Sequence, residues 1–301
     1  IETLEGVTRT PYNQYESVIL PLKAYLDGFG VDFSIKAVVK DIDFKEDAIT
    51  VTDIHLNENG KERTIHLNEE DICIMTNDCM TDNATLGDYH HAPAFTPDAP
   101  MSGELWRKGA EKKPSLGDPT PFFGKPEETN WESFTVTMKG NKLLKMIEQF
   151  SGNIPGSGAL MTFKDSSWLM SIVVAAQPHF KAQDADTTIF WGYGLYTDHV
   201  GDYVKKPMRD CTGAEILKEL LHQLHWEEHQ EEIMADVVNV IPCMMPYVDA
   251  QFQPRAMADR PPVVPQGSTN FAMVSQFVEI PEDMVFTEEY SVRAARIAVY
   301  T

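Results

Sequence analysis

His179 is the residue whose position in the sequence best suits it to contact a ligand. It follows a largely apolar run over residues 168–176, and the restricted backbone of Pro178 shapes a turn that would project the imidazole. A ring N–H at such a turn can donate a hydrogen bond to a carboxylate. A histidine bonded within its own loop fits the pattern equally well, so both interpretations stay open.

The stretch 268–301 also has binding chemistry. Residues 270–277 are typical of a buried strand with a polar end, and a loop of proline and acidic residues follows. Thr287 can then cap a helix over residues 288–300. Because the free N–H groups at a helix start suit an anionic or carbonyl-rich ligand, the stretch is typical of the closing half of a cofactor site. A plain strand–loop–helix corner explains the same pattern.

Other catalytic motifs are absent from the sequence. Gly156-Ser157-Gly158 lacks the third glycine of a dinucleotide fingerprint, since residue 161 is Met, and it precedes a predicted strand. The pyrophosphate loop of a bound dinucleotide would therefore lie before Ile1. No GxSxG nucleophile elbow occurs, and we assign no catalytic residue within this sequence.

Three histidines, His222, His225 and His229, fall at a spacing that would place them on one helix face. A zinc site needs a fourth ligand and outer partners. The glutamate-rich surroundings fit a solvent-exposed acidic helix end better, so we predict no metal site.

The composition restricts the classes of partner. With 301 residues and 43% hydrophobic residues, the chain can form a large core and about two domains. The formal net charge of −21 argues against nucleic-acid binding. No apolar run approaches the ~20 residues of a spanning helix. Four scattered cysteines without CxxC spacing indicate reduced thiols and a cytoplasmic protein. Because the sequence has no initiator Met or signal peptide, we expect a piece of a longer protein.

The first third of the sequence suggests a cofactor-binding fold. Residues 15–27 have helical apolar spacing, with a kink or delayed start expected at Pro21. Strands are predicted at 31–39, 48–55, 61–67 and 71–77, with a hairpin at 57–60. This order is typical of the second half of a two-dinucleotide-fold flavoprotein.

The middle of the sequence suggests a separate α+β domain. Residues 78–131 are rich in Pro, Gly, Asp and Thr and predict loops with short helices. We predict further helices at 140–150, 213–225 and 227–235. We predict strands at 159–164, 168–176 and 187–196, and strands that precede helices are typical of an α+β domain. Residues 237–265, with several prolines, are expected to return the chain to the cofactor fold.

Several blocks of sequence together resemble the oleate hydratase family, also called the myosin-cross-reactive antigens. These are FAD-dependent fatty acid hydratases. The blocks cover residues 12–21, 166–171, 177–180, 201–207, 259–265 and 285–293. The resemblance extends from about Leu4 to Tyr300.

The resemblance implies that an upstream dinucleotide-binding segment carries the glycine loop, a water-activating glutamate and a proton-donating tyrosine. In this chain, Gln14 and His179 match the residues that bind the substrate carboxylate in the family. Such a carboxylate needs several donors when it leaves water. In some relatives a Thr and an Asn on the preceding strand also help to bind the carboxylate. The matching positions here are Val173 and Ala175, which puts carboxylate binding, the chain-length preference or the regiochemistry in doubt.

The resemblance also implies FAD as cofactor. Its expected contacts are Thr76, Asn77, Ser268, Asn270, Phe271, Gln276 and Thr287. We therefore expect an α/β (α+β) protein comprising part of a two-dinucleotide FAD-binding fold and an α+β substrate domain. The expected boundaries are 1–95 for the second part of the FAD-binding domain, 96–245 for the fatty-acid domain and 246–301 for the return to the FAD-binding domain.

The sequence thus predicts part of a hydratase that adds water to a cis double bond, giving a 10-hydroxy acid from oleate. Two alternatives stay open: a flavin oxidoreductase of the amine-oxidase type and a non-catalytic fatty-acid-binding piece. The expected partners are an unsaturated fatty acid, the upstream segment and a second copy in a homodimer. Peripheral contact of the intact protein with a membrane is a further possibility.

Overall fold

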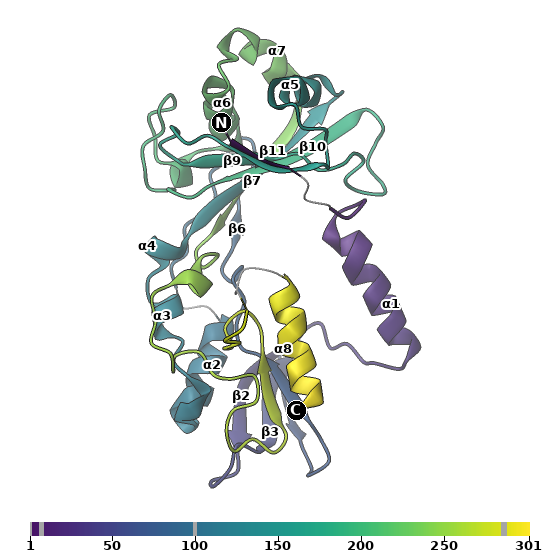
Figure 1. Cartoon of the computed structure of the whole chain (residues 1–301), viewed down its shortest axis with the longest axis vertical. Helices are drawn as coiled ribbons and strands as arrows, with labels where there is room; N and C mark the ends of the chain where they lie inside the picture. The colour runs from purple at the N-terminus through teal and green to yellow at the C-terminus, as the bar shows by residue number, and fades with distance from the viewer. Residues whose placement is uncertain (1, 6–8, 99–100, 284–287) are drawn as a thin grey trace. The chain divides into compact units, whose positions relative to one another are not determined.

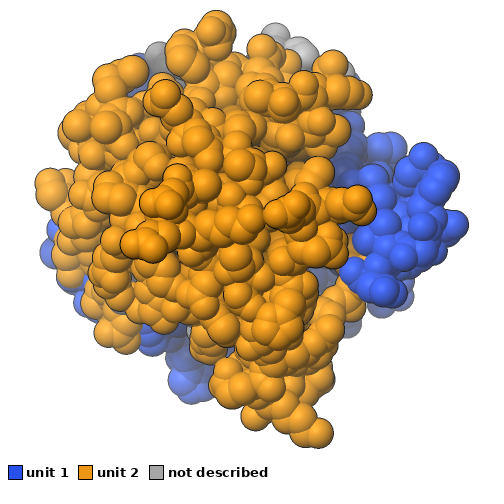
Figure 2. All heavy atoms as spheres, turned by 90° about the horizontal axis from the view of Figure 1, so that it is seen from below, with its two compact units in different colours: residues 1–32, 84–96, 130–245 blue, residues 33–83, 97–129, 246–301 orange. Residues whose placement is uncertain are grey.

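The chain folds into two compact units, each assembled from three separate stretches. The computed structural model describes residues 2–5, 9–98, 101–283 and 288–301 (Figure 1). Unit 1 comprises residues 1–32, 84–96 and 130–245, and unit 2 comprises residues 33–83, 97–129 and 246–301 (Figure 2). Both units therefore depend on contacts between residues far apart in the sequence.

Unit 1 is built on a seven-stranded sheet in which each neighbouring pair of strands is antiparallel. The strand order is β1 (Glu2–Glu5), β8 (Gly158–Thr162), β9 (Met170–Val173), β10 (Thr187–Gly194), β7 (Trp131–Lys139), β11 (Val237–Met245) and β6 (Thr85–Leu86). Strict alternation in β7 buries Phe134, Val136 and Met138 on one face. The alternation shows that one face of β7 is covered, and pairing with β10 and β11 places the strand in the interior of the sheet.

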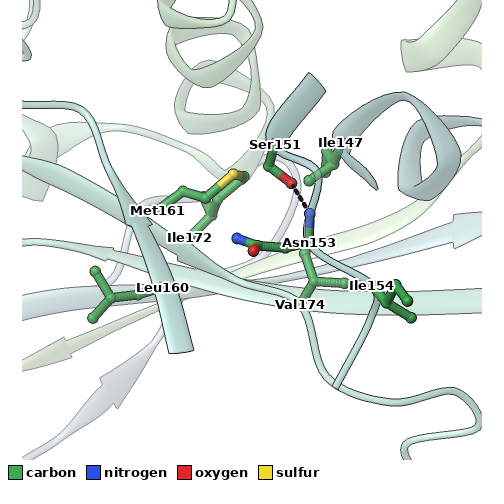
Figure 3. Close-up of a pocket in the computed structure, with 8 residues that line it drawn as sticks. All are labelled: Ile147, Ser151, Asn153, Ile154, Leu160, Met161, Ile172 and Val174. Atoms are coloured by element: carbon green, nitrogen blue, oxygen red, sulfur yellow. Dashed lines mark hydrogen bonds between the residues drawn. The ribbon is translucent and has the colours of Figure 1, made fainter. Parts of the chain in front are cut away.

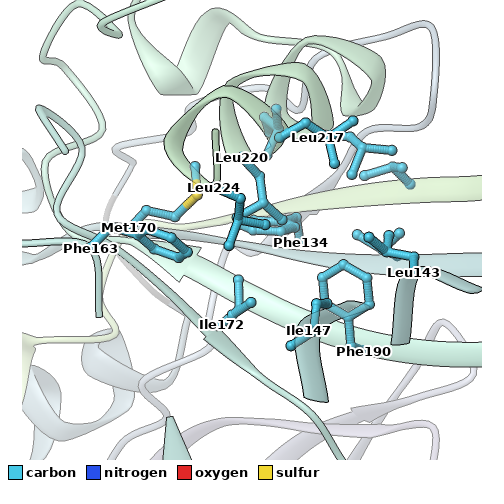
Figure 4. Close-up of a cluster of buried hydrophobic side chains, with 14 of the residues drawn as sticks. Phe134, Leu143, Ile147, Phe163, Met170, Ile172, Phe190, Leu217, Leu220 and Leu224 are labelled. Atoms are coloured by element: carbon cyan, nitrogen blue, oxygen red, sulfur yellow. The ribbon is translucent and has the colours of Figure 1, made fainter. Parts of the chain in front are cut away.

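Three helices cover one face of that sheet: α5 (Lys142–Ser151), α6 (Gly213–Gln223) and α7 (Gln230–Ala235) (Figure 1). Leu217, Leu220 and Leu224 descend from α6 and its end toward Phe134 and Ile172 of the sheet (Figure 4). A capping box of Thr212 and Glu215 begins α6. Two short 3-10 turns, η3 (Met208–Asp210) and η4 (Glu227–His229), flank these helices in sequence.

The N-terminal helix of unit 1 changes its winding at Pro21. A π-helical turn, η1 (Tyr15–Ile19), leads into α1 (Leu20–Gly28), which has Pro21 in its first turn. Since Pro has no N–H to bond back along the helix, it is tolerated only near such a start. The helix predicted at 15–27 is confirmed; it begins as a π-helical turn and becomes α-helical at Leu20, directly before Pro21.

Unit 2 combines an antiparallel meander with a parallel pair of strands. The meander consists of β2 (Ala37–Phe44), β3 (Val51–Glu58) and β4 (Lys61–His66), and the parallel pair consists of β5 (Cys73–Thr76) and β12 (Phe271–Val274). The β3–β4 turn has positive φ angles at Asn59 and Gly60, 53° and 82°, which confirms the predicted hairpin.

Two longer helices and several short helical turns complete unit 2 in the described part of the chain. They are α2 (Met101–Lys112), η2 (Pro114–Leu116), α3 (Thr120–Phe123), α4 (Pro126–Thr129), η5 (Ala250–Phe252) and α8 (Glu288–Tyr300). Trp106, Phe122 and Phe277 form an aromatic centre with ring separations of 5.5 to 6.0 Å. Tyr290 anchors α8, because its buried hydroxyl donates to Val278 O at 2.7 Å and accepts from Ile280 N at 3.0 Å.

The mixed α/β composition is confirmed, but one strand prediction is wrong in its position. The strand expected at 31–39 is β2 at 37–44, where it pairs with β3. Strands β7 and β11 were not predicted. In β11, Pro242 is accommodated because β6 pairs only with Cys243 and Met244, so no ladder N–H is required at residue 242.

Among the described residues, no helix has the length and apolarity required to cross a bilayer.

Candidate functional site

The segment that contains Gln14 is bonded directly to the loop that carries His179. Asn13 N and Asn13 Nδ2 both donate to His179 O, at 2.9 and 3.1 Å. The Glu16 carboxylate accepts from Asn13 Nδ2 at 2.7 Å and from Lys181 N at 2.9 Å. We call these contacts the Asn13 clasp. Gln14 follows Asn13 directly, so the structure brings the two predicted carboxylate-binding residues into one region of unit 1.

Two glutamines hold the His179 loop against β10. Gln177 Nε2 donates to Ile189 O at 2.8 Å, and Gln177 Oε1 accepts from Ile189 N at 3.1 Å. Gln183 Oε1 accepts from His179 N at 2.7 Å, while Gln183 Nε2 donates to Gln177 Oε1 at 2.9 Å. The Gln177–Pro178 peptide bond is cis. The backbone of His179 is therefore fixed at both its N–H and its carbonyl.

Burial lowers the pKa of the His179 imidazole, and the positive charge of Arg9 lowers it further, while Glu16 opposes both effects. The ring is therefore neutral at neutral pH, and one of its nitrogens carries an N–H. Such a ring can donate one hydrogen bond to an anion. When a carboxylate binds, its charge would raise the pKa of His179 and favour uptake of a proton.

The two positions expected to match polar donors of some relatives are apolar and buried. Val173 ends β9 with 2% of its surface exposed, and Ala175 follows with 7% exposed. Neither side chain can donate a hydrogen bond, so a carboxylate here would depend more strongly on Gln14 and His179.

A small pocket lies in unit 1 between the end of α5 and strands β8 and β9 (Figure 3). It is lined by Ile147, Ser151, Asn153, Ile154, Leu160, Met161, Ile172 and Val174. Its cavity volume of about 20 Å³ is far below the roughly 300–1,000 Å³ typical of pockets for drug-sized ligands. We therefore do not assign it to a long fatty acid.

Three of the expected FAD contacts lie at the carboxyl ends of β5 and β12, the end at which open α/β sheets bind ligands. Thr76 ends β5 and is exposed, whereas Asn77 is fully buried. Asn77 Nδ2 donates to Phe277 O at 3.3 Å, and Asn77 Oδ1 accepts from the Ser275 hydroxyl. The Asn77 amide therefore ties the two strand ends together. Gln276 follows β12 at the same end and is partly buried.

Three other expected contacts lie at the opposite, amino end of β12. Asn270 bonds to both backbone groups of Val51, at 2.8 and 3.0 Å, and the ring of Phe271 meets Phe44 edge-on at 5.5 Å. These side chains hold β12 to the meander. Ser268 Oγ is buried without a hydrogen-bond partner among the described residues. The structure thus does not gather the expected FAD contacts at one end of the strand pair, and Thr287 lies outside the described residues.

The donor set is compatible with part of a cofactor site. The Thr76 hydroxyl is exposed at the carboxyl end, and Ser268 Oγ is a buried polar atom that lacks a protein partner in the described structure. Buried polar atoms are normally bonded, so Ser268 is the better-supported of the two as a ligand contact. The amides of Asn77 and Asn270 are already used within the protein.

The three histidines do not share a helix face, contrary to their spacing. Helix α6 ends at Gln223, His225 has a positive φ of 59°, and His229 ends η4. His222 Nε2 instead contacts Gln230 Oε1 at 3.0 Å. In the part of the chain that the structure describes, no group of three His, Cys, Asp or Glu side chains is arranged to hold a metal ion.

Sequence reasoning missed the residues that position His179, namely Asn13, Glu16 and Gln183. Asn13 and Glu16 lie 166 and 163–165 positions away from the loop they bond, so no local pattern reveals the contact. Gln177 and Gln183 lie on either side of His179 in the sequence. Their polar side chains are the one local sign that hydrogen bonds hold this loop.

Comparisons with known proteins identify the family. The MCRA family model matches residues 1–300. A linoleate hydratase from Lactiplantibacillus plantarum is 40% identical over 323 residues, which cover 100% of this chain and 57% of the relative. An oleate hydratase from Streptococcus pyogenes serotype M49 (strain NZ131) is 36% identical over 302 residues, which cover 96% of this chain and 51% of the relative. The chain spans about half the length of these curated relatives. With the match along nearly its whole length, this chain belongs to the MCRA family, which confirms the resemblance inferred from its motifs.

Proposed function

We propose that this chain is part of an FAD-dependent hydratase of unsaturated fatty acids. Water adds across a cis double bond: the π bond is lost, one C–O and one C–H bond form, and no electrons are exchanged with a cofactor. For oleate the product would be a 10-hydroxy acid. The names of the two relatives support this reaction class.

The observation that carries the proposal is the Asn13 clasp, which brings Gln14 and His179 into one region of unit 1. A fatty acid leaving water must bring its carboxylate with it, and an unpaired carboxylate is costly to bury. An amide N–H from Gln14 and a ring N–H from His179 would each donate to that carboxylate. Arg9 adds positive charge near the ring, which favours an anion there.

Unit 2 is proposed to face the flavin. Its parallel pair β5–β12, together with the meander and α8, supports the interpretation as the second part of a two-dinucleotide FAD fold. Thr76 and Ser268 would contact FAD directly, while Asn77 and Asn270 would hold the strands that present them. Bound FAD would supply orientation and charge stabilisation to a redox-neutral reaction. The acid and base that act on the double bond are proposed to lie outside residues 1–301.

The proposal extends to location and assembly. The four cysteines are free, which supports a reducing, cytoplasmic compartment. We also propose a homodimer that contacts membranes peripherally while taking up its lipid substrate. Sedimentation of the protein at its natural length, alone and with vesicles, tests both statements.

Titration of FAD and of oleate into the 301-residue chain tests whether this chain binds the fatty acid while the catalytic acid and base lie outside it. We expect oleate binding that weakens in Gln14→Ala and His179→Ala, weak or absent FAD binding and no hydration. Fatty acid binding that is indifferent to both substitutions would favour a non-catalytic lipid-binding piece. Reduction of the flavin by substrate in the protein at its natural length would favour an oxidoreductase, and hydration by the 301-residue chain alone would contradict the proposed division.

A further inference from the structure

Unit 1 contains a buried carboxyl group that the proposed function does not use. Glu132, in β7, has 0% of its surface exposed. Its side chain lies on the same face of β7 as Phe134, Val136 and Met138, which belong to the hydrophobic core. Within the described residues, neither oxygen of the Glu132 carboxyl group has a hydrogen-bond partner. A buried group of this kind requires an explanation, because an isolated charge in such a place costs many kcal/mol.

A second buried glutamate in the same unit shows how this fold accommodates a carboxylate. Glu219 of α6 is also 0% exposed, but its oxygens accept from Asp202 N at 2.8 Å, Tyr203 N at 3.0 Å and Val204 N at 2.8 Å. Three backbone donors suit a carboxylate anion. Glu132 receives no such donors in the described structure, so its surroundings suit the neutral acid.

The turn formed by residues 207–211 covers Glu132. In the sheet, Glu132 lies opposite Gly194 of β10 and Met244 of β11. The space above Gly194 is filled by Met208, since a Cβ placed on Gly194 would lie 2.3 Å from Met208 Sδ. Met208 and Met244 are both 0% exposed. The buried side chain of Met208, and the turn that bears it, therefore lie next to Glu132 on this face of the sheet.

The charged and titratable groups around Glu132 offer it no cation. Asp210, at the exposed end of the turn, repels a negative charge on Glu132 and adds to the effect of burial, so both raise the pKa of Glu132 well above its ordinary value. Burial is the main cause of the raised pKa of the Cys211 and Cys243 thiols. A negative charge on Glu132 would raise both pKa values further, so these thiols lie near its carboxyl group.

Two basic side chains near this turn contact other residues. Lys206 Nζ pairs with Glu215 Oε2 at 2.9 Å, and the Arg209 guanidinium lies 5.3 Å from the centre of the Phe95 ring. Neither contact leads to the Glu132 carboxyl group.

We propose that Glu132 is a proton-operated latch: as a neutral acid it allows the 207–211 turn to close on β7 and β10, and loss of its proton releases that turn. The carboxylate left behind can be solvated only if water reaches it, and the 207–211 turn, in which Asp210 is exposed, is a part of the enclosure that reaches solvent. Closed unit 1 binds one proton more than open unit 1, so alkaline pH favours the open form.

Hydrogen–deuterium exchange of the 301-residue chain from pH 5 to pH 9 tests the latch. After correction for the intrinsic rate, the opening equilibrium constant for peptides covering 207–211 should rise up to tenfold per pH unit in the wild type. In Glu132→Gln, which keeps the shape but cannot ionise, this dependence should vanish. Glu219→Gln is the matched control: it should loosen residues 202–204 at every pH and leave the pH dependence at 207–211 in place.

Infrared spectroscopy of wild-type chain with ¹³C-labelled glutamate supplies a test that does not require the variant to fold. A protonated carboxyl C=O band should persist at pH 7 and disappear over the pH range in which the 207–211 turn opens. Absence of that band at pH 7, or a Glu132→Gln variant that keeps the wild-type pH dependence, would overturn the proposal.

Discussion

Replacing His179 by alanine should weaken fatty acid binding by an amount that follows from its contacts. The ring is neutral, and its N–H would donate to a charged carboxylate. A hydrogen bond to a charged group contributes about 1.5–3 kcal/mol, which corresponds to a roughly 10- to 150-fold increase in Kd. Val173 and Ala175 offer no substitute donor, so we expect little compensation. Gln14→Ala should fall in the same range, and the double variant should lose less than the sum, because both residues share one carboxylate.

The pH dependence of binding separates the role of His179 from simple damage to the loop. Because burial lowers the pKa of the free ring below about 6.5 and a bound carboxylate raises it, the bound state takes up protons. Oleate affinity should therefore increase as the pH falls below about 6.5. The contribution of His179 to folding stability depends on pH in the opposite direction. It is present above a pH of about 6.5 and is lost as the pH falls through the lowered pKa of the folded state.

Isothermal titration calorimetry with oleate, between pH 5.5 and pH 8, measures both effects. His179→Gln keeps a donor but cannot titrate, so it should retain much of the affinity and lose the pH dependence. His199→Ala is the control, since His199 is an exposed histidine of unit 1 that contacts Ser167 O at 3.1 Å. A His179→Ala variant that binds oleate as tightly as His199→Ala would refute the carboxylate assignment.

Three further substitutions test the fold, each by urea denaturation followed by circular dichroism. Thr212→Ala removes the capping box of α6 and should cost about 0.5–2 kcal/mol of stability; no loss would mean that the cap is not formed. Gly192→Ala places a Cβ 2.5 Å from Phe134 Cζ and 2.6 Å from Ser171 O in the sheet, so it should cost at least about 1–3 kcal/mol; an unchanged midpoint would contradict the packing. Asn270→Ala leaves both backbone groups of Val51 unpaired and should cost about 1–3 kcal/mol in unit 2, whereas a variant that lost only FAD binding would show that Asn270 contacts the cofactor.

Local signals predicted several helices. The predicted helix at 288–300 agrees with α8, and the one at 213–225 contains α6, whereas the 12-residue α2 lies in a stretch predicted as loops with short helices. The strands were harder. Residues 131–139 alternate regularly, but they follow a long Pro- and Gly-rich stretch that obscured the pattern. Pro242 hid β11, because a proline is acceptable in a strand only where the neighbouring ladder is incomplete, and that is known only once β6 is placed.

The candidate site was predictable in its parts but not in its geometry. Gln14 and His179 came from motif resemblance, while the Asn13 clasp joins residues 166 positions apart and leaves no local trace. The expected FAD contacts were chosen at strand ends, and a sequence does not show which ends meet. Asn77 and Asn270 illustrate the difficulty, since both have the polar side chains of ligand contacts and both bond within the protein.

Hydration of oleate in H₂¹⁸O by the protein at its natural length, supplied with FAD, tests the proposed reaction most directly. We expect a hydroxy fatty acid that carries ¹⁸O, a flavin absorption spectrum that is unchanged after many turnovers, and a much lower rate in Gln14→Ala and His179→Ala at limiting substrate. Absence of the labelled hydroxy acid, or stoichiometric reduction of the flavin by the fatty acid, would contradict it.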